Sequence, residues 1–420
     1  MLNAYFDNQG HGNLYRLTNL RSLTFDFVDE KNLTNSNFKI KITKDDYTFP
    51  GIYIVSVKEY SPQWSGKDLS INSRHVLFEI PLNVINAARH KNVFIVIDNS
   101  SEGFPLNYQE CDGFRELHTA MNQLKLPPLS VILVTSDREC DISYNEWLIT
   151  NNENRMISHV YAFTHVHYFV EKIPDQPLII SALNNPEVKN FNSLNRTARN
   201  HRVEHIIELY LRELEKNALI SGHYRNDSYR EILKNFYVDM PYSIFCNSVK
   251  SVFSSPLIID GDWSSNTDLT PDKNNETIFN HSIYKNSLLS VVTETLFHSA
   301  GNFITEKTMK PIAAGHPFMI LGQFGFLKNL NEMGYKTRFY GIDQSYDDIK
   351  DPIKRFQVFH QSLEKWCKYS YEEKKNFIEK SLPYIEYNQN LFRSKNYIKD
   401  YYDCLYKTVL LILKKNKYHG

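Results

Sequence analysis

Two uninterrupted apolar runs constrain the fold of this chain more than any other feature of its sequence. The runs are Val93-Phe-Ile-Val-Ile97 and Val131-Ile-Leu-Val-Thr135, and both lack the polar alternation of a half-exposed strand. Strands with this composition are typical of a parallel sheet that is covered on both faces. Residues 114–124, between the two runs, carry apolar residues at helical spacing, as a crossover helix would. This part of the chain is therefore predicted to be α/β.

A second series of the same kind follows in the other half of the chain. The start of the chain differs, because residues 23–28, 38–42 and 52–57 alternate apolar and polar positions, as short strands do. At 420 residues, the chain is long enough for two or three domains. The apolar patterns of the second half predict alternating strands and helices at 191–194, 202–216, 288–292, 306–314, 318–321 and 324–333.

These patterns divide the chain into three parts. A polar stretch with two prolines at residues 171–177 indicates a linker. We expect an N-terminal domain with a β-rich start at 1–185, a Rossmann-like domain at 186–365, and helices at 366–420 that pack across both. Residues 223–285 are polar and irregular, as in a surface insertion. The predicted fold class is α/β, with two Rossmann-like domains that face a cleft and a β-rich start.

The charge balance and the cysteines argue against several classes of function. Lys+Arg and Asp+Glu both number 48, so the strong field of a dedicated nucleic-acid or membrane-surface binder is not expected. The 5 cysteines lie far apart without a CxxC pair, which supports neither a zinc knuckle nor a disulfide framework. The N-terminus does not resemble a secretion signal, and the longest apolar run, at 409–413, is too short to span a membrane. We therefore expect a cytoplasmic protein without a membrane span.

The segment at residues 294–307 carries the strongest chemical signal. Glu294 follows a predicted strand, and ligands of a parallel α/β sheet bind beyond the carboxyl ends of its strands. Thr305 can cap the next helix, whose first N–H groups then point toward an anion. Lys307 opposes the helix dipole unless a phosphate is bound, and Glu306 could accept hydrogen bonds from a ribose diol. The alternative is an ordinary capped helix with solvated charges.

A second cluster, Ser193-Leu-Asn-Arg-Thr-Ala-Arg-Asn-His-Arg202, joins a predicted strand to a predicted helix. It contains Arg196, Arg199 and Arg202, and planar guanidinium groups can bind phosphate through two parallel hydrogen bonds. Cations oppose the helix dipole at this end, which favours a bound anion over a solvated basic face. These arginines are therefore candidates for binding a phosphate group of a ligand, and the sequence leaves open which of them contacts it.

These two clusters resemble the donor-binding region of the α1,3-fucosyltransferase family. The resemblance rests on Thr305-Glu-Lys, followed by Ala313-Ala-Gly-His-Pro-Phe-Met-Ile-Leu-Gly322, and extends over residues 190–345 with gaps. Where the family has Phe-Glu-Asn-Ser, this chain has Thr293-Glu-Thr-Leu, so the donor base and sugar stay open. The chain looks closer to the glycosyltransferase-like proteins of bacteria and large bacteriophages than to the animal enzymes of the family.

The resemblance implies both a fold and residue roles. The family has the GT-B fold, which consists of two Rossmann-like domains. By the same resemblance, Glu306 would hold the ribose of the donor nucleotide and Lys307 its diphosphate. Asn195 would belong to the Asn-containing turn that the family has at this place, and Arg199 or Arg202 would clamp the diphosphate. The domain at 186–365 would then bind the nucleotide sugar, and the domain at 1–185 would lie on the acceptor side.

Two further patterns could hold a metal ion. Asp260 and Asp262 form an Asp-x-Asp pair after an apolar run, as in glycosyltransferases of the GT-A class, where a metal bridges the donor phosphates. The pair falls within the irregular insertion, however, and such pairs often arise by chance. His165 and His167 alternate on one predicted strand without an evident third ligand. We therefore expect no metal and no cofactor besides a nucleotide-sugar co-substrate.

A catalytic base is expected in the loop that follows residues 93–97. Asp98 and Glu102 are the carboxylates of this loop, and either could take the proton of an acceptor hydroxyl. Glu102 has the longer reach and follows two serines, whereas Asp98 is better placed to cap the loop backbone. The alternative is that Asp98 caps the loop and Glu102 is solvated.

The sequence thus predicts a glycosyltransferase that moves a sugar from a nucleoside-diphosphate sugar to a hydroxyl of a glycan or similar acceptor, without a metal. One alternative is a phage-type transferase that glycosylates modified DNA bases, which the zero net charge does not favour. The other alternative is a nucleotide-sugar-binding module without activity.

Overall fold

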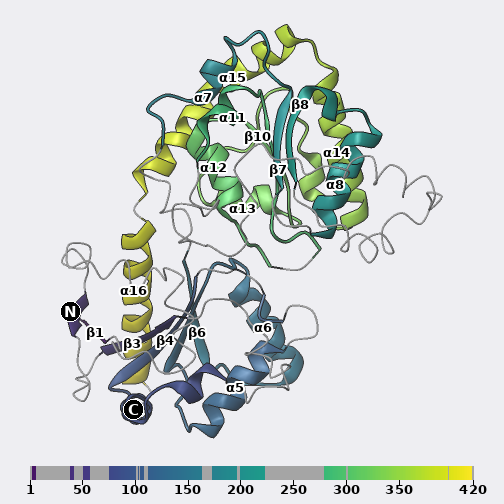
Figure 1. The fold of residues 1–420 in the computed structure, drawn as a ribbon. Helices are drawn as coiled ribbons and strands as arrows, with labels where there is room; N and C mark the ends of the chain where they lie inside the picture. Colours follow the sequence, from purple (N-terminus) through teal and green to yellow (C-terminus); the bar gives the residue numbers. More distant parts are fainter. Residues whose placement is uncertain are drawn as a thin grey trace. The chain divides into compact units, whose positions relative to one another are not determined.

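The computed structural model forms two compact units (Figure 1). Unit 1 comprises Met1–His165, Ser299–Ile304 and Asn396–Gly420, and unit 2 comprises Val166–His298 and Thr305–Lys395. The chain therefore passes between the units more than once. The residues that the structure describes are 2–5, 38–41, 51–56, 75–100, 103, 105–107, 112–162, 173–195, 199–222, 279–298, 301–395 and 397–418.

Unit 1 contains a six-stranded sheet in the order β2-β1-β3-β4-β5-β6. Each pair of neighbouring strands in it is parallel. The two apolar runs form β4 and β5, and every residue of both strands is buried, as predicted. The strands are β1 (Leu2–Tyr5), β2 (Phe38–Lys41), β3 (Gly51–Ser56), β4 (Val93–Asn99), β5 (Val131–Thr135) and β6 (Ile157–Tyr161).

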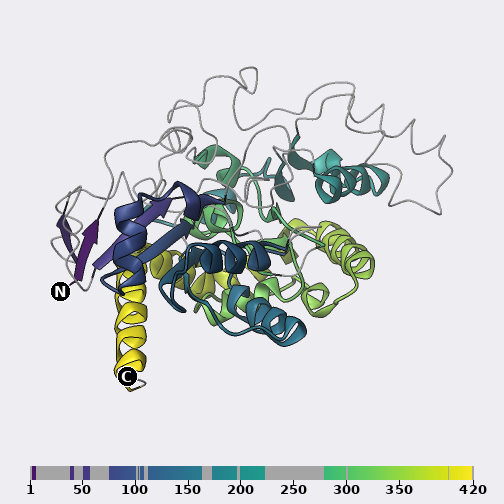
Figure 2. The ribbon, with the colours of Figure 1, turned by 90° about the horizontal axis from the view of Figure 1, so that it is seen from below.

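Helices pack on both faces of this sheet, because each strand sends successive side chains to opposite sides. Ile95 of β4 packs with the helices between residues 76 and 151, whereas its neighbours Phe94 and Val96 pack against the C-terminal helix α16. Figure 2 shows α16 beside the strands of unit 1, and Val409 at the start of the last apolar run is fully buried there. The helices are η2 (Val76–Glu79), α4 (Leu82–Arg89), α5 (Gly113–Gln123), α6 (Cys140–Asn151) and α16 (Tyr397–Tyr418).

Unit 2 contains a four-stranded sheet in the order β10-β9-β7-β8, and its strand pairs are also parallel. Helices α8 and α14 lie on one side of it and α12 and α15 on the other (Figure 1). The strands are β7 (Phe191–Asn195), β8 (Ala218–Gly222), β9 (Ser290–Thr293) and β10 (Phe318–Leu321). The helices are α7 (Leu178–Ala182), α8 (Asn200–Leu211), η4 (Glu215–Asn217), α11 (His281–Lys285), α12 (Glu306–Ala314), α13 (Phe326–Glu332), η6 (Ser345–Asp348), α14 (Pro352–Lys368) and α15 (Tyr371–Ser394).

Local signals at both ends of α12 explain why it begins and ends where the sequence predicts. The Thr305 side chain accepts a hydrogen bond from the N–H of Lys307, which satisfies one of the first N–H groups of the helix. The helix ends at Gly315, whose φ of +62° lies in the left-handed region. A Cβ at Gly315 would lie 2.6 Å from Cα of Pro177, so this position requires glycine for space as well as for conformation.

The structure confirms the predicted α/β class with parallel sheets, and it places the unit boundaries differently from the expected domain boundaries. The first boundary lies at 165/166 instead of 185/186. Residues after 172 belong to unit 2 because α15 holds them, with Gln389 donating to the carbonyl oxygen of Pro174 (3.1 Å) and of Ala313 (3.0 Å). The expected C-terminal helical part is divided, since α15 belongs to unit 2 and α16 to unit 1.

The predicted strand at 23–28 lies outside the residues that the structure describes, as does most of the expected insertion at 223–285. Among the helices of the described part, none is long and apolar enough to cross a membrane.

Candidate functional site

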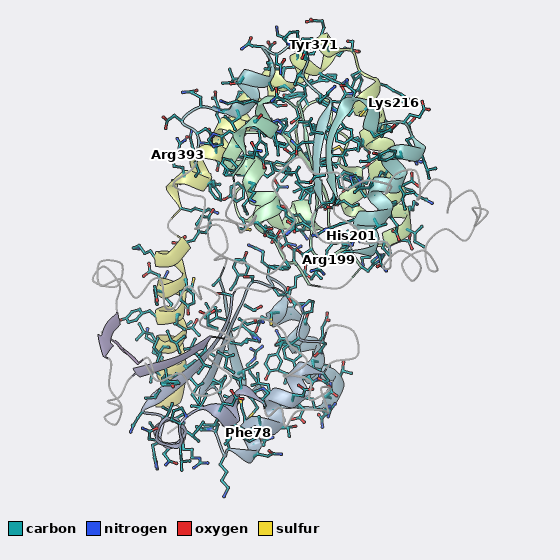
Figure 3. All side chains as sticks on the ribbon, viewed as in Figure 1. Phe78, Arg199, His201, Lys216, Tyr371 and Arg393 are labelled. Carbon is teal, nitrogen blue, oxygen red and sulfur yellow. The ribbon has the colours of Figure 1, made fainter. Side chains whose placement is uncertain are left out.

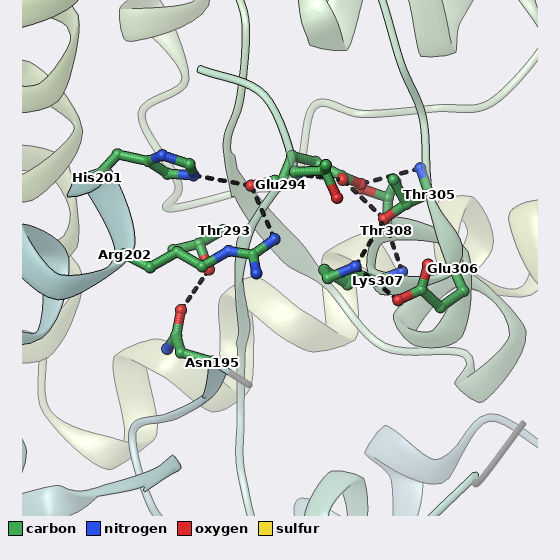
Figure 4. A network of polar contacts seen from close by, with 10 residues as sticks. Asn195, His201, Arg202, Thr293, Glu294, Thr305, Glu306, Lys307 and Thr308 are labelled. Carbon is green, nitrogen blue, oxygen red and sulfur yellow. Dashed lines mark hydrogen bonds and ion pairs between the residues drawn. The ribbon is translucent and has the colours of Figure 1, made fainter. Parts of the chain in front are cut away.

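The predicted donor-binding residues gather at the carboxyl end of the sheet of unit 2. Asn195 is the last residue of β7 and Thr293 the last residue of β9, the strand beside it. The Thr293 hydroxyl donates a hydrogen bond to Oδ1 of Asn195, and both side chains are buried (Figure 4). This is the edge at which parallel α/β sheets bind ligands.

Glu294, directly after β9, organises the start of α12. Its carboxylate is fully buried and accepts four hydrogen bonds within unit 2. Thr305 contributes two of these, from its backbone N–H (3.2 Å) and its hydroxyl (2.7 Å). The others come from the N–H of Thr295 (3.0 Å) and the hydroxyl of Thr308 (2.6 Å). In this structure the carboxylate of Glu294 therefore fixes the helix start from inside.

The backbone of Glu294 also anchors the start of α8. Its carbonyl oxygen accepts hydrogen bonds from Nε2 of His201 (2.8 Å) and from the guanidinium of Arg202 (3.1 Å). Burial, with the nearby Arg202 charge adding to it, lowers the pKa of His201 well below its ordinary value, so this imidazole is neutral and donates from Nε2. Arg202 is 2% exposed, whereas Arg199 at the N-cap position of α8 is only half-buried. Of the two arginines, Arg199 is therefore the more accessible.

Glu306 and Lys307, at the first positions of α12, form an ion pair with 2.6 Å between Lys307 Nζ and Glu306 Oε1. Their side chains are 11% and 25% exposed, so this pair is more accessible than the buried network around Glu294. The backbone N–H of Lys307 is already bonded to Oγ1 of Thr305, at 3.2 Å. An anion at this helix start would therefore meet the Lys307 ammonium group and not its N–H.

Arg355 of α14 is a buried arginine that contacts the loops beside this site, and its sequence neighbourhood does not single it out. It is 3% exposed, and its guanidinium lies 4.6 Å from the centre of the Phe297 ring. Because these contacts join loops after β9 and β10 to α14, no local pattern around residue 355 could have indicated them. The guanidinium donates hydrogen bonds to the carbonyl oxygens of Phe297, Gly322, Ile349 and Lys350.

The predicted residues are thus brought together to different extents. The buried network contains Asn195, Arg202, Glu294 and Thr305, with Glu306 and Lys307 beside it (Figure 4). Arg199 lies at the N-cap position of α8. Other candidates lie outside the residues that the structure describes, namely Arg196, Glu102, Asp260, Asp262, His165 and His167.

Asp98, at the end of β4 in unit 1, shows the capping geometry that the sequence suggested. One carboxyl oxygen accepts a hydrogen bond from the N–H of Ser100 (2.9 Å), and the other accepts one from the Tyr401 hydroxyl (3.4 Å). The side chain is 4% exposed, and burial raises the pKa of its carboxyl group. Within the described part of the chain, no group of three His, Cys, Asp or Glu side chains is arranged to hold a metal ion.

Acid is expected to destabilise unit 2 through its buried histidines. Burial lowers the pKa of His316 and of His360 from 6.5 to about 4. Below the ordinary pKa the unfolded chain binds protons that the folded chain does not, so stability present at neutral pH is lost as the pH falls toward 4. Each histidine should cost about 2 kcal/mol at about pH 5. Urea unfolding midpoints near neutral pH and near pH 5 measure this loss, and His316→Gln should reduce it. The same pH dependence in the wild type and in His316→Gln would contradict this prediction.

Comparisons with known proteins give a distant likeness in backbone structure. No protein-family model matches the chain, and no curated protein matches its sequence. An alpha,alpha-trehalose-phosphate synthase (UDP-forming) from Burkholderia vietnamiensis aligns with a TM-score of 0.46 and 9% identity, over 98% of each chain. The alpha,alpha-trehalose 6-phosphate synthase from Burkholderia multivorans gives 0.42 and 10%, over 88% of this chain and 72% of that one.

A third solved structure aligns with this chain at a lower TM-score. It is WaaG, a glycosyltransferase involved in lipopolysaccharide biosynthesis, with a TM-score of 0.35 and 12% identity, over 96% of this chain and 95% of that one.

Proposed function

We propose that this chain is a glycosyltransferase of the GT-B kind that uses a nucleoside-diphosphate sugar as donor. One observation carries the proposal: residues far apart in the sequence, from Asn195 to Lys307, meet at the carboxyl end of one parallel sheet. The more accessible cations beside this network are Lys307 and, at the start of α8, Arg199. Two cations near the end of a parallel sheet suit a diphosphate.

The proposed contacts follow from accessibility. Lys307 and Arg199 bind the diphosphate, and Glu306 accepts hydrogen bonds from the ribose. In the unliganded protein the Glu306 carboxylate neutralises Lys307, so donor binding exchanges this partner for a phosphate oxygen. Glu294 and Arg202 are buried, and we assign them to positioning.

The proposed reaction transfers the sugar to a hydroxyl group. The hydroxyl oxygen forms a bond to the anomeric carbon while the bond from that carbon to the diphosphate oxygen breaks. The diphosphate takes the electron pair of the broken bond, and a carboxylate takes the proton of the hydroxyl. Lys307 and Arg199 offset the charge that develops on the leaving diphosphate, which removes the need for a divalent metal in this proposal.

Lys307→Ala and Arg199→Ala are each expected to weaken the binding of UDP or GDP by about 1.5–3 kcal/mol, since each loses a charge-assisted phosphate bond. Glu306→Ala should weaken binding through the lost ribose contact. Isothermal titration calorimetry with both nucleotides measures these effects.

Two control variants test whether the loss of any basic side chain of unit 2 weakens nucleotide binding. Lys216→Ala removes a lysine that is also paired with a glutamate, Glu213 (2.8 Å), but precedes β8 at the amino end of the same sheet. Figure 3 shows Lys216 at the end of unit 2 opposite Arg199 and His201. Arg338→Ala removes an exposed arginine of unit 2. Equal affinities for control and site variants would overturn the assignment of the site.

A second experiment separates the proposed enzyme from the alternatives. Incubation with UDP and GDP sugars, with and without EDTA, should release free sugar slowly in the absence of an acceptor. A binding module without activity would release none. If release required a divalent metal, the metal-independent form of the proposal would be wrong. Acceptor binding that weakens steeply with salt would favour a DNA acceptor over a glycan.

A further inference from the structure

Two buried histidines link Asn195 to a distant helix of unit 2. Oγ of Ser193 lies 3.0 Å from Nε2 of His205 on α8, and Nδ1 of His205 lies 2.9 Å from Nε2 of His360 on α14. Nδ1 of His360 lies 2.8 Å from the carbonyl oxygen of Phe356. At the other end, Nδ2 of Asn195 donates to Oγ of Ser193 (3.0 Å). Ser193, His205 and His360 are each 0% exposed.

Only one arrangement of protons satisfies this chain of hydrogen bonds. The carbonyl oxygen of Phe356 can only accept, so Nδ1 of His360 carries a proton. With both imidazoles neutral, Nε2 of His360 accepts from Nδ1 of His205, and Nε2 of His205 accepts from the Ser193 hydroxyl. Both histidines are therefore Nδ1–H tautomers.

The direction of the chain also settles the side-chain amide of Asn195. Because the Ser193 hydroxyl donates to His205, its oxygen can only accept from Asn195, so the amide nitrogen must face Ser193. Oδ1 then faces Thr293 and accepts a hydrogen bond from its hydroxyl group. The amide of Asn195 thus joins the ends of β7 and β9, one of which leads to Arg199 and the other to Glu294.

The imidazoles stay neutral because of their surroundings. Burial lowers the pKa of His205 well below its ordinary value, with the neighbouring His360 and His201 adding to the effect. Near His360, Arg212 is paired with Glu208 (2.8 Å) and Glu364 (2.7 Å), so the charges there largely offset one another.

We propose that His205 and His360 are positioning residues of the donor site, and that their tautomers fix the amide orientation of Asn195. The inference rests on the proposed function, because it takes the carboxyl end of this sheet as the donor site. Removing His360 leaves Nδ1–H of His205 without its acceptor. A proton on Nε2 in place of Nδ1 then lets His205 donate a hydrogen bond to Ser193. The Ser193 hydroxyl in turn donates to Asn195, which favours the flipped orientation of the Asn195 amide. A change on α14 is thus transmitted to the ends of β7 and β9.

The test compares His360→Leu with His360→Gln. Glutamine can accept from His205 through its amide oxygen and donate to Phe356 through its amide nitrogen, so it can preserve the direction of the chain. We expect His360→Leu to weaken UDP or GDP binding about threefold to tenfold, the size of one lost neutral hydrogen bond, and His360→Gln to restore most of it. Nitrogen-15 NMR should show His205 as the Nδ1–H tautomer in the wild type and as Nε2–H in His360→Leu.

The control is His316→Leu, which removes another fully buried histidine of unit 2, one that bonds to Ser287 and Ser290 near the amino end of β9. It should lower stability without changing the His205 tautomer or nucleotide affinity. If His360→Leu does not fold, Ser193→Ala breaks the same chain one link further on and should weaken binding to the same extent.

The outcomes distinguish this inference from the proposed function. If the wild type binds neither UDP nor GDP, the donor site and this inference are both overturned. If the wild type binds and His360→Leu binds equally well despite a changed His205 tautomer, only the positioning role is overturned. An Nε2–H tautomer of His205 in the wild type would overturn the proton arrangement itself.

Discussion

Glu294→Ala is expected to destabilise unit 2 by about 3–5 kcal/mol and to abolish measurable nucleotide binding, because buried donors that lose their acceptor cost about 1–3 kcal/mol each. The backbone N–H groups of Thr295 and Thr305 cannot turn away to find another partner. The hydroxyls of Thr305 and Thr308 can rotate, so their loss should cost less. The start of α12, which carries Glu306 and Lys307, would lose its internal anchor.

Two variants test whether this loss comes from the hydrogen bonds of the carboxylate. Glu294→Gln keeps the shape and one acceptor oxygen, so it should fall between the wild type and Glu294→Ala. Glu379→Ala removes an exposed carboxylate of α15 and should change stability by less than about 0.5 kcal/mol. Urea unfolding and calorimetry with UDP or GDP provide both readouts. Wild-type stability in Glu294→Ala would contradict the role that we assign to this side chain.

The sequence predicted those elements whose limits are set by neighbouring residues. The bounds of α12 and β10 agree with the prediction at both ends, because Thr305, Gly315 and a short apolar run define them locally. Helix α8 was expected at 202–216 and is found at Asn200–Leu211, although the apolar periodicity continues to Leu214. There Glu213 takes a positive φ of 56°, and the chain turns toward β8.

The contacts that hold the site could not be predicted in this way. The sequence predicts that Glu294 follows a strand, as it does, but its hydrogen bonds to Thr305 and Thr308 depend on contacts between parts of the chain that are apart in the sequence. His205 and His360 meet across 155 positions of sequence, and nothing near either residue identifies the other as its partner. Strand ends can be located from sequence periodicity, whereas the direction of a buried side chain depends on the packing of remote helices.

Among the two candidate bases, the structure leaves Asp98 poorly suited to proton transfer. Both of its oxygens already accept hydrogen bonds, one from the Ser100 backbone and one from Tyr401 of α16. The residue is 4% exposed, so an acceptor hydroxyl has little access to its carboxyl group. Glu102 lies outside the described residues and stays a prediction from sequence, and we propose it as the base.

Glu102→Ala is therefore expected to lower the single-turnover rate by about 10²–10⁴ at saturating donor, through loss of general-base catalysis, with donor affinity unchanged. Asp98→Asn is the matched variant, because it removes the charge and keeps an oxygen that can accept from Ser100. It should retain a rate near that of the wild type. If Asp98→Asn lost a large part of the rate and kept normal donor affinity, Asp98 and not Glu102 would be the base. Normal rates in both variants would place the base elsewhere in unit 1, since the carboxyl ends of other strands of that unit also lead into loops.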